Sequence, residues 1–423
     1  MDDQTTGMQN LDALPVRLPN ATQGKPYSHA SMRLPKTEGC EFTLSGHEDA
    51  GLSALLTECE DCYELTIEGT PAEPGDYAIV LQCKPAGWQE GDPLAEKRML
   101  LMVNPNPRLL WRDIPTPENV PFYKPDRDNG AIAADGGKRV IAASQRGRSH
   151  AQEGKPRDDH FQLYHNPDSG WYVLAVADGA GSAIYSRRGS EIACHEAVAY
   201  CKSRLTDAAE FEGAIAAYQC TDDEQAARKA VGNHIYSIVG NAAYRAHRAI
   251  TDEAQVVESS KPKDFATTLL LAICKKFEFG WFIASFWVGD GAMCIYDREA
   301  HSVSLLGIPD EGEFSGQTRF LTMPEIFADT ASLYRRLRFG IRPDFTALML
   351  MTDGVSDPMF GTEANLNNPD KWDQMWDRLQ SGYPEDGIGG VDLDSPRAEE
   401  QLLDWLGFWR PGEHDDRTIA ILY

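Results

Sequence analysis

The sequence lacks any long hydrophobic run. Its longest apolar stretches, residues 171–177 and 268–274, are the size of strands and fall far short of the roughly 18 residues that a membrane span needs. The opening Met1-Asp-Asp-Gln-Thr-Thr-Gly has neither the basic region nor the apolar core of a secretory signal. We therefore expect a cytoplasmic protein without a membrane partner.

Positive charge is also scarce. The 423 residues include 40 Lys and Arg against 65 Asp and Glu, so the net charge is −25. Such an acidic surface repels phosphate backbones and anionic lipids, which argues against nucleic acid and membranes as partners. It favours divalent cations and basic protein partners.

Cysteine usage gives no sign of a disulfide framework. The nine cysteines are odd in number and scattered over a long chain, which favours reduced thiols. Cys59 and Cys62 have the spacing of metal ligands, and Cys40 and Cys83 lie in the same region. A zinc site is one interpretation of these four residues, and thiols that pack or lie in loops are the other.

Several catalytic signatures are missing. The sequence contains no Gly-x-x-x-x-Gly-Lys-Ser/Thr, no Gly-x-Ser-x-Gly and no kinase or Rossmann fingerprint. The pair His195-Glu196 has no second histidine at zinc-protease spacing. These absences argue against the commonest nucleotide-binding, serine-hydrolase and zinc-protease chemistries.

The composition and the sequence pattern change twice along the chain. Residues 1–110 contain short β-rich runs that end at turn residues, which predicts a small all-β sandwich. Prolines cluster in residues 111–134, which predicts an extended linker without secondary structure. Residues 135–423 contain strands and long helices in blocks, which predicts an α+β layered domain. The expected strands there are 139–144, 171–177, 265–274, 281–288, 293–296, 347–351 and 418–422, and the expected helices are 182–205, 223–250 and 397–406.

Asp-Gly occurs five times, and a turn is the simplest interpretation of any single occurrence. Asp135 and Asp386 lie in loop-like sequence and keep that interpretation. Asp178, Asp290 and Asp353 differ because each ends an apolar strand. A carboxylate in that position is fixed at the rim of a sheet.

Two acidic pairs, Asp158-Asp159 and Asp415-Asp416, adjoin further strands. Carboxylates gathered at one rim repel one another unless a counter-charge is present. Mg²⁺ or Mn²⁺ is the natural counter-charge, because hard divalent cations prefer oxygen ligands. The alternative is that these strand ends lie far apart and that each Asp caps a turn.

The order of these motifs resembles that of the type 2C family of metal-dependent serine/threonine protein phosphatases, over about residues 135–423. Residues 147–159 resemble a bacterial subgroup with the pattern Ser-His-x-x-x-Gly-x-Pro-x-x-Asp. The resemblance implies a four-layer α-β-β-α sandwich. The other matching segments are Val176-Ala-Asp-Gly-Ala-Gly-Ser182, Phe265-Ala-Thr-Thr-Leu-Leu270, Val288-Gly-Asp-Gly291, Thr352-Asp-Gly-Val-Ser-Asp357 and Asp415-Asp-Arg-Thr-Ile419.

The resemblance also implies a mechanism. Phosphoserine and phosphothreonine would be hydrolysed by direct attack of a hydroxide that bridges two Mn²⁺ or Mg²⁺ ions, with Asp178 and Asp353 central to catalysis. Asp290 would hold a third ion, or it is a hydrogen-bonded carboxylate at the rim. The implied metal ligands are Asp158, Asp159, Asp178, the Gly179 carbonyl, Asp290, Asp353 and Asp415.

Three positions depart from the commoner family pattern. Asp158 stands where the family has a metal-binding Glu, Gly154 where it has a phosphate-binding Arg, and Asp416 where it has Asn. A phosphate dianion entering so acidic a site needs cationic help beyond the metals. We expect Arg148 and Lys155 to supply it.

Two further basic features have alternative interpretations. His150 could protonate the leaving oxygen, or it is a structural histidine in a loop. Residues 335–342 contain four arginines, which is unusual in so acidic a chain. This segment could dock a phosphorylated or acidic partner, or it is a solvated helix face.

The N-terminal region resembles immunoglobulin-like modules of bacterial surface and regulatory proteins. The matching segments are Leu18-Pro-Asn-Ala-Thr-Gln-Gly-Lys-Pro-Tyr27, Gly51-Leu52 and Gly69-Thr-Pro-Ala-Glu-Pro-Gly-Asp-Tyr77. The leading hypothesis is therefore a bacterial signalling phosphatase with an N-terminal partner-binding module, a phosphoprotein substrate and a cognate serine/threonine kinase. The alternatives are a non-catalytic phosphatase-like interaction or sensing protein and a small-molecule phosphohydrolase.

Overall fold

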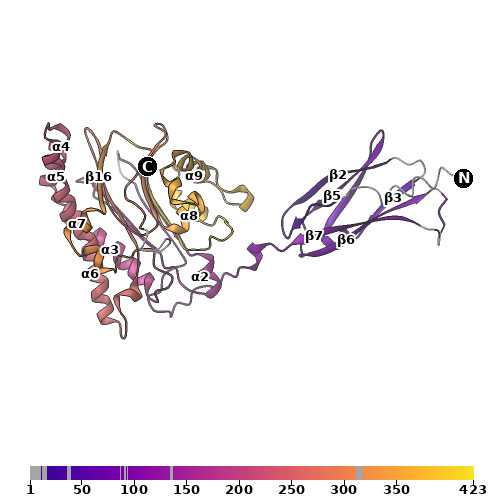
Figure 1. Cartoon of the computed structure of the whole chain (residues 1–423), viewed down its shortest axis with the longest axis horizontal. Coiled ribbons are helices and arrows are strands. Elements are labelled where there is room, and N and C mark those ends of the chain that lie inside the picture. The colour runs from indigo at the N-terminus through magenta and orange to yellow at the C-terminus, as the bar shows by residue number, and fades with distance from the viewer. Residues whose placement is uncertain are drawn as a thin grey trace. The chain divides into compact units, whose positions relative to one another are not determined.

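The computed structural model describes Leu11 and residues 17–35, 40–85, 87–89, 92, 94–133, 137–310 and 318–423, so the turn expected at Asp135 lies outside the described residues. The chain forms two compact units, Met1–Arg112 and Asp113–Tyr423 (Figure 1). In the described part of the chain, no helix has both the length and the apolar character needed to cross a membrane.

The N-terminal unit is rich in strands. One sheet has the order β1-β7-β6-β3 and the other has the order β2-β5-β4. Leu34, Ile67 and Leu101 are fully buried in a core to which both sheets contribute. The elements are β1 (Ala21–Thr22), β2 (Tyr27–Pro35), β3 (Cys40–Ser45), η1 (Glu48–Ala50), β4 (Leu52–Glu58), β5 (Cys62–Gly69), β6 (Gly75–Pro85), β7 (Ala95–Asn104) and η2 (Pro107–Leu110).

The cysteines of this unit do not gather into a metal site among the described side chains. Cys59 and Cys62 flank the turn between β4 and β5, where the Cys59 N–H donates to the Cys62 carbonyl at 2.8 Å. Cys83 is buried in the core. The side chain of Cys40 lies outside the described part of the structure. The zinc interpretation therefore stays a prediction.

The C-terminal unit mixes strands and helices, as the sequence predicts. One sheet has the order β10-β11-β12-β13-β16, and the other has the order β15-β14-β17-β18-β9-β8. The strands are β8 (Arg127–Ile132), β9 (Val140–Gln145), β10 (His160–His165), β11 (Tyr172–Ala177), β12 (Leu269–Phe277), β13 (Gly280–Val288), β14 (Ala292–Asp297), β15 (Ser302–Leu305), β16 (Leu337–Arg342), β17 (Ala347–Met351) and β18 (Arg417–Leu422).

Helices lie against both sheets of this unit (Figure 1). The α-helices are α2 (Arg148–Glu153), α3 (Ser186–Leu205), α4 (Ala209–Cys220), α5 (Glu224–Ile235), α6 (Asn241–Val256), α7 (Thr330–Tyr334), α8 (Asp353–Phe360), α9 (Pro369–Ser381) and α10 (Ala398–Trp405). Shorter turns are the π-helical η3 (Tyr236–Gly240) and the 3₁₀ turns η4 (Pro262–Phe265), η5 (Pro324–Phe327), η6 (Glu363–Asn367) and η7 (Pro384–Asp386).

The central strands are apolar throughout because both of their faces are covered. In β11, Val173 and Ala175 pack in a core that includes α3, α5 and α6. Leu174 and Val176 point the other way, into a core made by residues of the two sheets. A third core packs α8, α9 and α10 against β9, β14, β17 and β18. This burial fixes the strand ends, which hold the acidic residues.

Several sequence predictions of secondary structure are wrong. The proline-rich residues 111–134 do not lack secondary structure, because β8 pairs with β9 at a sheet edge. Residues 337–342 are not a helix face, because they form β16, which pairs with β13. The single helix expected over 223–250 is α5 and α6 joined by the π-helical turn η3. Helices α4, α8 and α9 have no counterpart among the predicted elements.

Candidate metal centre

Strand ends from both sheets meet at one rim. Asp178 follows β11, Asp290 follows β13 after one glycine, and Asp353 begins α8 just after β17. One carboxylate oxygen from each of these residues lies within 4.8 Å of the other two. The three Asp-Gly pairs that end apolar strands in the sequence therefore lie together.

Backbone contacts fix the position of Asp178. Its N–H donates to the Thr268 hydroxyl at 2.8 Å, and its carbonyl accepts from the Thr267 hydroxyl at the same distance. Gly179 next to it forms a β-bridge with Thr267. A Cβ at Gly179 would lie only 2.7 Å from the carbonyl oxygen of Asp158, so only glycine allows this close approach.

Burial and mutual repulsion raise the pKa of the clustered carboxyl groups. Burial raises the pKa of Asp178 well above its ordinary value, and the charges of Asp353, Asp159, Asp415 and Asp290 raise it further. Burial, followed by the charge of Asp290, raises the pKa of Asp353 in the same way. Asp415 is the most exposed of the predicted ligands, and partial burial still raises its pKa. The charges that act most strongly on Asp178 and Asp353 are therefore all negative.

Asp158 and Asp159 form the other side of the site. Burial, and then the charge of Asp416, raises the pKa of Asp158 to about 6 and that of Asp159 to about 7. One oxygen of Asp159 accepts from the Thr352 hydroxyl at 2.9 Å. Buried oxygens without a hydrogen-bond partner among the described residues remain on Asp158, Asp159 and Asp290.

Asp416 and His150 stabilise the Asp158 loop. Asp416 is 2% exposed and accepts from the backbone N–H groups of Gly147 at 2.6 Å and Asp158 at 2.5 Å. Burial lowers the pKa of His150, but the charges of Asp416 and Asp158 outweigh it and raise that pKa to about 9. His150 Nε2 lies 3.6 Å from a carboxylate oxygen of Asp158. Protonated His150 is thus an ion-pair partner of both carboxylates.

Lys124, which the sequence gave no reason to single out, lies beneath this loop. It is 4% exposed, and its Nζ donates to the Asp159 carbonyl and the Ser190 hydroxyl, both at 2.9 Å. Burial, and then the charge of Arg157, lowers the pKa of Lys124 to about 7. Lys124, which lies in the proline-rich segment, thereby holds the backbone of the Asp158-Asp159 pair in place.

The predicted phosphate-binding residues have other partners. Arg148 donates to the carbonyls of Gly407 at 2.9 Å and Phe408 at 3.3 Å. Lys155 is exposed and forms an ion pair with Glu153 at 2.5 Å. Their predicted roles stay predictions.

Arg187, near the start of α3, is a basic residue that sequence reasoning missed. Its Nη1 lies 3.8 Å from a carboxylate oxygen of Asp158, and its side chain is 13% exposed. The guanidinium also donates to the carbonyls of Pro121 at 3.0 Å and Ile184 at 3.2 Å. Its position in a long helix, far from Asp158 in the sequence, gave no signal of this contact.

The donor set fits a hard divalent cation. Every clustered group is a carboxylate, several oxygens are buried without a hydrogen-bond partner among the described residues, and the raised pKa values indicate unneutralised repulsion. Mg²⁺ and Mn²⁺ prefer such oxygen ligands. The rim therefore offers the ligand atoms that a divalent-metal site requires.

A family model described as Protein phosphatase 2C matches residues 146–407. The chain belongs to this family, whose members are phosphatases that use Mg²⁺ or Mn²⁺ and act on phosphoproteins. No curated protein matches the chain.

Several solved structures match part of this chain at low sequence identity. Serine/threonine phosphatase Stp1 from Staphylococcus aureus is 15% identical over 67% of this chain and 93% of that chain, with a TM-score of 0.36. Serine-threonine phosphatase 2C from Toxoplasma gondii is 10% identical over 70% and 98%, with a TM-score of 0.41. RsbX in complex with magnesium is 12% identical over 70% and 100%, with a TM-score of 0.37.

Proposed function

We propose that this chain hydrolyses phosphoserine and phosphothreonine in proteins, using divalent metal ions held at the carboxylate rim. The observation that carries the proposal is the approach of oxygens from Asp178, Asp290 and Asp353 to within 4.8 Å of one another. Buried oxygens of Asp158 and Asp159 that accept no hydrogen bond from the described residues add to it. At neutral pH such a group is stable only with protons or cations bound.

The predicted ligands divide around Asp178, which would be shared by two ions. When bound, the ions would neutralise the carboxylates, lower the pKa of water so that it attacks the phosphorus directly, and offset the charge of the phosphate. Asp353 and Asp415 would complete the ligand set of one ion. Asp158, Asp159 and the Gly179 carbonyl would complete the ligand set of the other ion, and Asp290 would hold a third ion.

The other residues of the chain would position the ligands and the phosphate. Thr267 and Thr268 hold the Asp178 backbone, which keeps its carboxylate at the rim. Arg187 has the charge and the place to bind phosphate oxygens, because its guanidinium lies beside Asp158. His150 Nε2 is on the same side of the site and would donate a proton to the leaving oxygen.

We also propose that the three cores of the C-terminal unit form the predicted four-layer α-β-β-α sandwich. The strand-rich N-terminal unit, with its two sheets around one core, supports the proposal of an immunoglobulin-like module that binds partners. A cognate kinase, a role in bacterial signalling and a cytoplasmic location stay predictions.

Hydrolysis assays test the proposed function. The protein should release phosphate from an aryl phosphate and from a phosphothreonine peptide with Mn²⁺ or Mg²⁺, and not with chelator. Loss of a residue that supports a metal ligand typically lowers activity 10- to 100-fold. Replacing a ligand itself, by Asp178→Asn or Asp353→Asn, should therefore lower kcat/KM by at least about 100-fold.

Asp377→Asn is the matched control, because Asp377 is exposed on α9 and pairs only with Arg298 among the described residues. It should keep wild-type activity. Activity that persists in chelator, or in both rim variants, would rule out the metal-dependent site. Hydrolysis of sugar phosphates and not of phosphopeptides would support the small-molecule alternative.

A further inference from the structure

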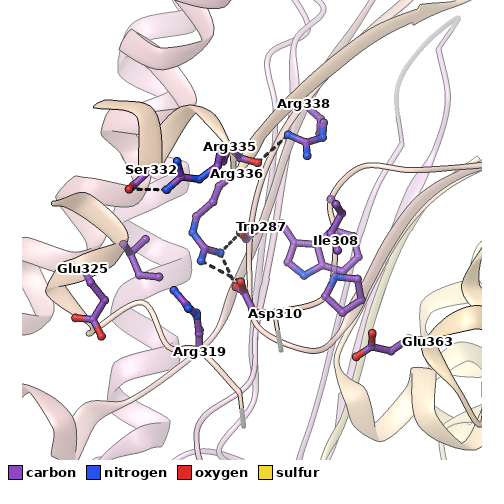
Figure 2. A pocket seen from close by; sticks show the side chains of 13 residues that line it. Trp287, Ile308, Asp310, Arg319, Glu325, Ser332, Arg335, Arg336, Arg338 and Glu363 are labelled. Atoms are coloured by element: carbon purple, nitrogen blue, oxygen red, sulfur yellow. Dashed lines mark hydrogen bonds and ion pairs between the residues drawn. The ribbon is translucent and has the colours of Figure 1, made fainter. Parts of the chain in front are cut away.

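A concave site adjoins the segment that leads to Asp290. It is a pocket of about 550 Å³, and its lining includes four arginines in a chain whose net charge is −25. Figure 2 shows Arg336 and Arg319 extending into the same part of the pocket from opposite sides. The charged and aromatic side chains of its lining include Trp287, Asp310, Arg319, Arg335, Arg336 and Arg338.

One of the arginines is neutralised within the protein. Arg336 donates from both terminal nitrogens to the carboxylate of Asp310, at 2.5 Å and 2.9 Å, and to the carbonyl of Trp287 at 3.1 Å. This ion pair is buried, with 13% and 14% of the two side chains exposed. Arg336 therefore builds the wall of the pocket and is not available for a ligand.

The other three arginines form no ion pair with a carboxylate among the described residues, although hydrogen bonds from Ser332, and then the charge of Arg335, help to lower the pKa of the exposed Asp329. Arg335 donates to the Ser332 hydroxyl at 2.8 Å, and Arg338 donates to the carbonyls of Arg335 and Leu337 at 2.8 Å and 2.9 Å. Arg319 makes no hydrogen bond or ion pair within the described part of the chain. Each guanidinium thus keeps donors that can bind an anion.

The acidic residues of the pocket set limits on the ligand. Glu325 and Glu363 also line the pocket, so its charge is not purely positive. Among the described lining residues, Arg319, Arg335 and Arg338 therefore outnumber the two glutamates once the Arg336–Asp310 pair is set aside. This balance suits one compact anionic group of the kind that a guanidinium binds with two parallel hydrogen bonds, such as a phosphate or a carboxylate.

The pocket adjoins the metal centre through two short links. Asp310 accepts from the Gly289 N–H at 3.2 Å, and Gly289 directly precedes Asp290. The Thr318 hydroxyl donates to the Asp290 carboxylate, and Arg319 is the next residue. Trp287 precedes Asp290 by only three residues, which span at most about 10 Å of backbone. An extended peptide covers the same distance with about three residues.

We propose that this arginine pocket binds a second anionic group of the substrate, a phosphate or a carboxylate, about three residues from the phosphorylated serine or threonine. The proposal rests on the phosphatase activity proposed above and gives it a substrate class, acidic phosphopeptides. The acidic surface of the protein repels such a substrate, and the three arginines provide a local electrostatic attraction that offsets this repulsion.

A peptide panel assayed at saturating Mn²⁺ and 0.15 M salt tests the pocket. Each peptide has one phosphothreonine and, two to six residues away on either side, a phosphoserine, a glutamate pair or neutral residues. The wild type should favour one of the doubly anionic spacings by about tenfold in kcat/KM, which corresponds to about 1.4 kcal/mol. The phosphoserine and glutamate arms distinguish the two sources of the anion.

Arg319→Gln combined with Arg338→Gln should remove this preference, and Arg335→Gln should lower it with little risk to folding, because Arg335 is exposed. The kcat/KM for an aryl phosphate, measured in each variant, separates a change in substrate preference from a general loss of activity. Arg204→Gln combined with Arg248→Gln, at exposed positions of α3 and α6 outside the pocket, is the control with the same change of charge and should keep the preference.

Two results would overturn the inference: a wild type that treats all peptides within twofold, or arginine variants that keep the preference. A wild type that hydrolyses no substrate, aryl phosphate included, would overturn the proposed function instead. In that case, fluorescence anisotropy with the same labelled peptides decides the inference. The inference would be supported if the wild type bound the doubly anionic peptide more tightly than the singly anionic one and the double variant did not. Equal binding of the two peptides by the wild type would refute it.

Discussion

The backbone N–H of Asp158 donates to Oδ2 of Asp416 at 2.5 Å. The other oxygen of Asp416 accepts from the Gly147 N–H at 2.6 Å, and His150 Nδ1 lies 3.1 Å from both oxygens. Burial alone would raise the pKa of Asp416, but His150 and these hydrogen bonds outweigh it and lower that pKa. Asp416 is therefore an ionised anchor that joins the first acidic motif to the last.

This arrangement predicts that Asp416→Asn is not a neutral change, although Asn is the commoner family residue. An amide has one acceptor oxygen, so the N–H of either Gly147 or Asp158 would face an NH₂ group. A lost hydrogen bond to a charged group costs about 1.5–3 kcal/mol, so urea denaturation should show a comparable loss in the free energy of unfolding. Mn²⁺ titration calorimetry should show weaker binding, because Asp158 loses its support.

Asp377→Asn serves as the control for this experiment as well. If Asp416→Asn left both the stability and the Mn²⁺ affinity at wild-type values, Asp416 would not be an anchor.

The raised pKa values predict that pH controls metal binding. Protons and cations compete for the same oxygens, and Asp159 and Asp158 have pKa values of about 7 and about 6. At pH 6 the first is mostly protonated and the second is half protonated, whereas at pH 8 both are ionised. We expect Mn²⁺ to bind roughly tenfold more weakly at pH 6 than at pH 8.

The same shifts fix the sign of the stability change in chelator. A carboxyl group whose pKa is raised on folding contributes stability below its unfolded pKa of about 3.9, and this contribution is lost as pH rises through the folded pKa. Mn²⁺ should therefore raise the melting temperature more at pH 8 than at pH 6. An equal rise at both pH values would show that Asp158 and Asp159 are already ionised at pH 6 without metal.

The sequence predicted the gathering of the rim carboxylates better than it predicted the residues around them. Asp178, Asp290 and Asp353 could be found because each follows an apolar run, and strands covered on both faces must end at a rim. Lys124 and Arg187 could not be found, since they reach Asp158 or Asp159 from distant segments and carry no local pattern. Such contacts arise from tertiary packing alone.

The segment after Arg335 could have been assigned correctly. Leu337, Phe339 and Ile341 alternate with Arg338, Gly340 and Arg342, which is the period of a strand and not of a helix. The arginines of this segment are also compatible with a solvated helix face, which is why charge alone did not indicate a strand. The edge strand β8 was harder to recognise, because residues 127–132 contain little apolar sequence and lie just after the prolines.

Lys124 predicts where an independently folding catalytic fragment begins. A fragment of residues 113–423 keeps Lys124 and should hydrolyse aryl phosphate like the full chain. A fragment of residues 125–423 loses the donors to the Asp159 carbonyl and the Ser190 hydroxyl. Leaving buried acceptors unpaired costs about 1–3 kcal/mol, so the shorter fragment should unfold at lower urea concentration.

Lys124→Met in the full chain separates this effect from truncation. It should reproduce the loss of stability while leaving the chain length unchanged. The role of Lys124 would be contradicted if the two fragments were equally stable and the Lys124→Met variant were as stable as the wild type.

The last prediction concerns the cation that binds the substrate phosphate. Arg187→Ala should lower kcat/KM for an aryl phosphate about 10- to 150-fold, because hydrogen bonds to charged groups contribute about 1.5–3 kcal/mol. Mn²⁺ affinity should not fall, since no ligand is removed and a positive charge beside Asp158 is lost. Steady-state kinetics at saturating Mn²⁺ and Mn²⁺ titration measure the two effects separately.

Arg148→Ala and Lys155→Ala provide the comparison, because both residues were expected from the sequence to bind phosphate. Arg148 is held by the carbonyls of Gly407 and Phe408, and Lys155 is paired with Glu153, so neither is aimed at Asp158 by its described contacts. We therefore expect both variants to stay within about threefold of wild type. The assignment would be reversed if Arg148→Ala or Lys155→Ala strongly lowered kcat/KM while Arg187→Ala kept wild-type kinetics. In that case the phosphate would have to draw the side chain of Arg148 or Lys155 away from its present partners.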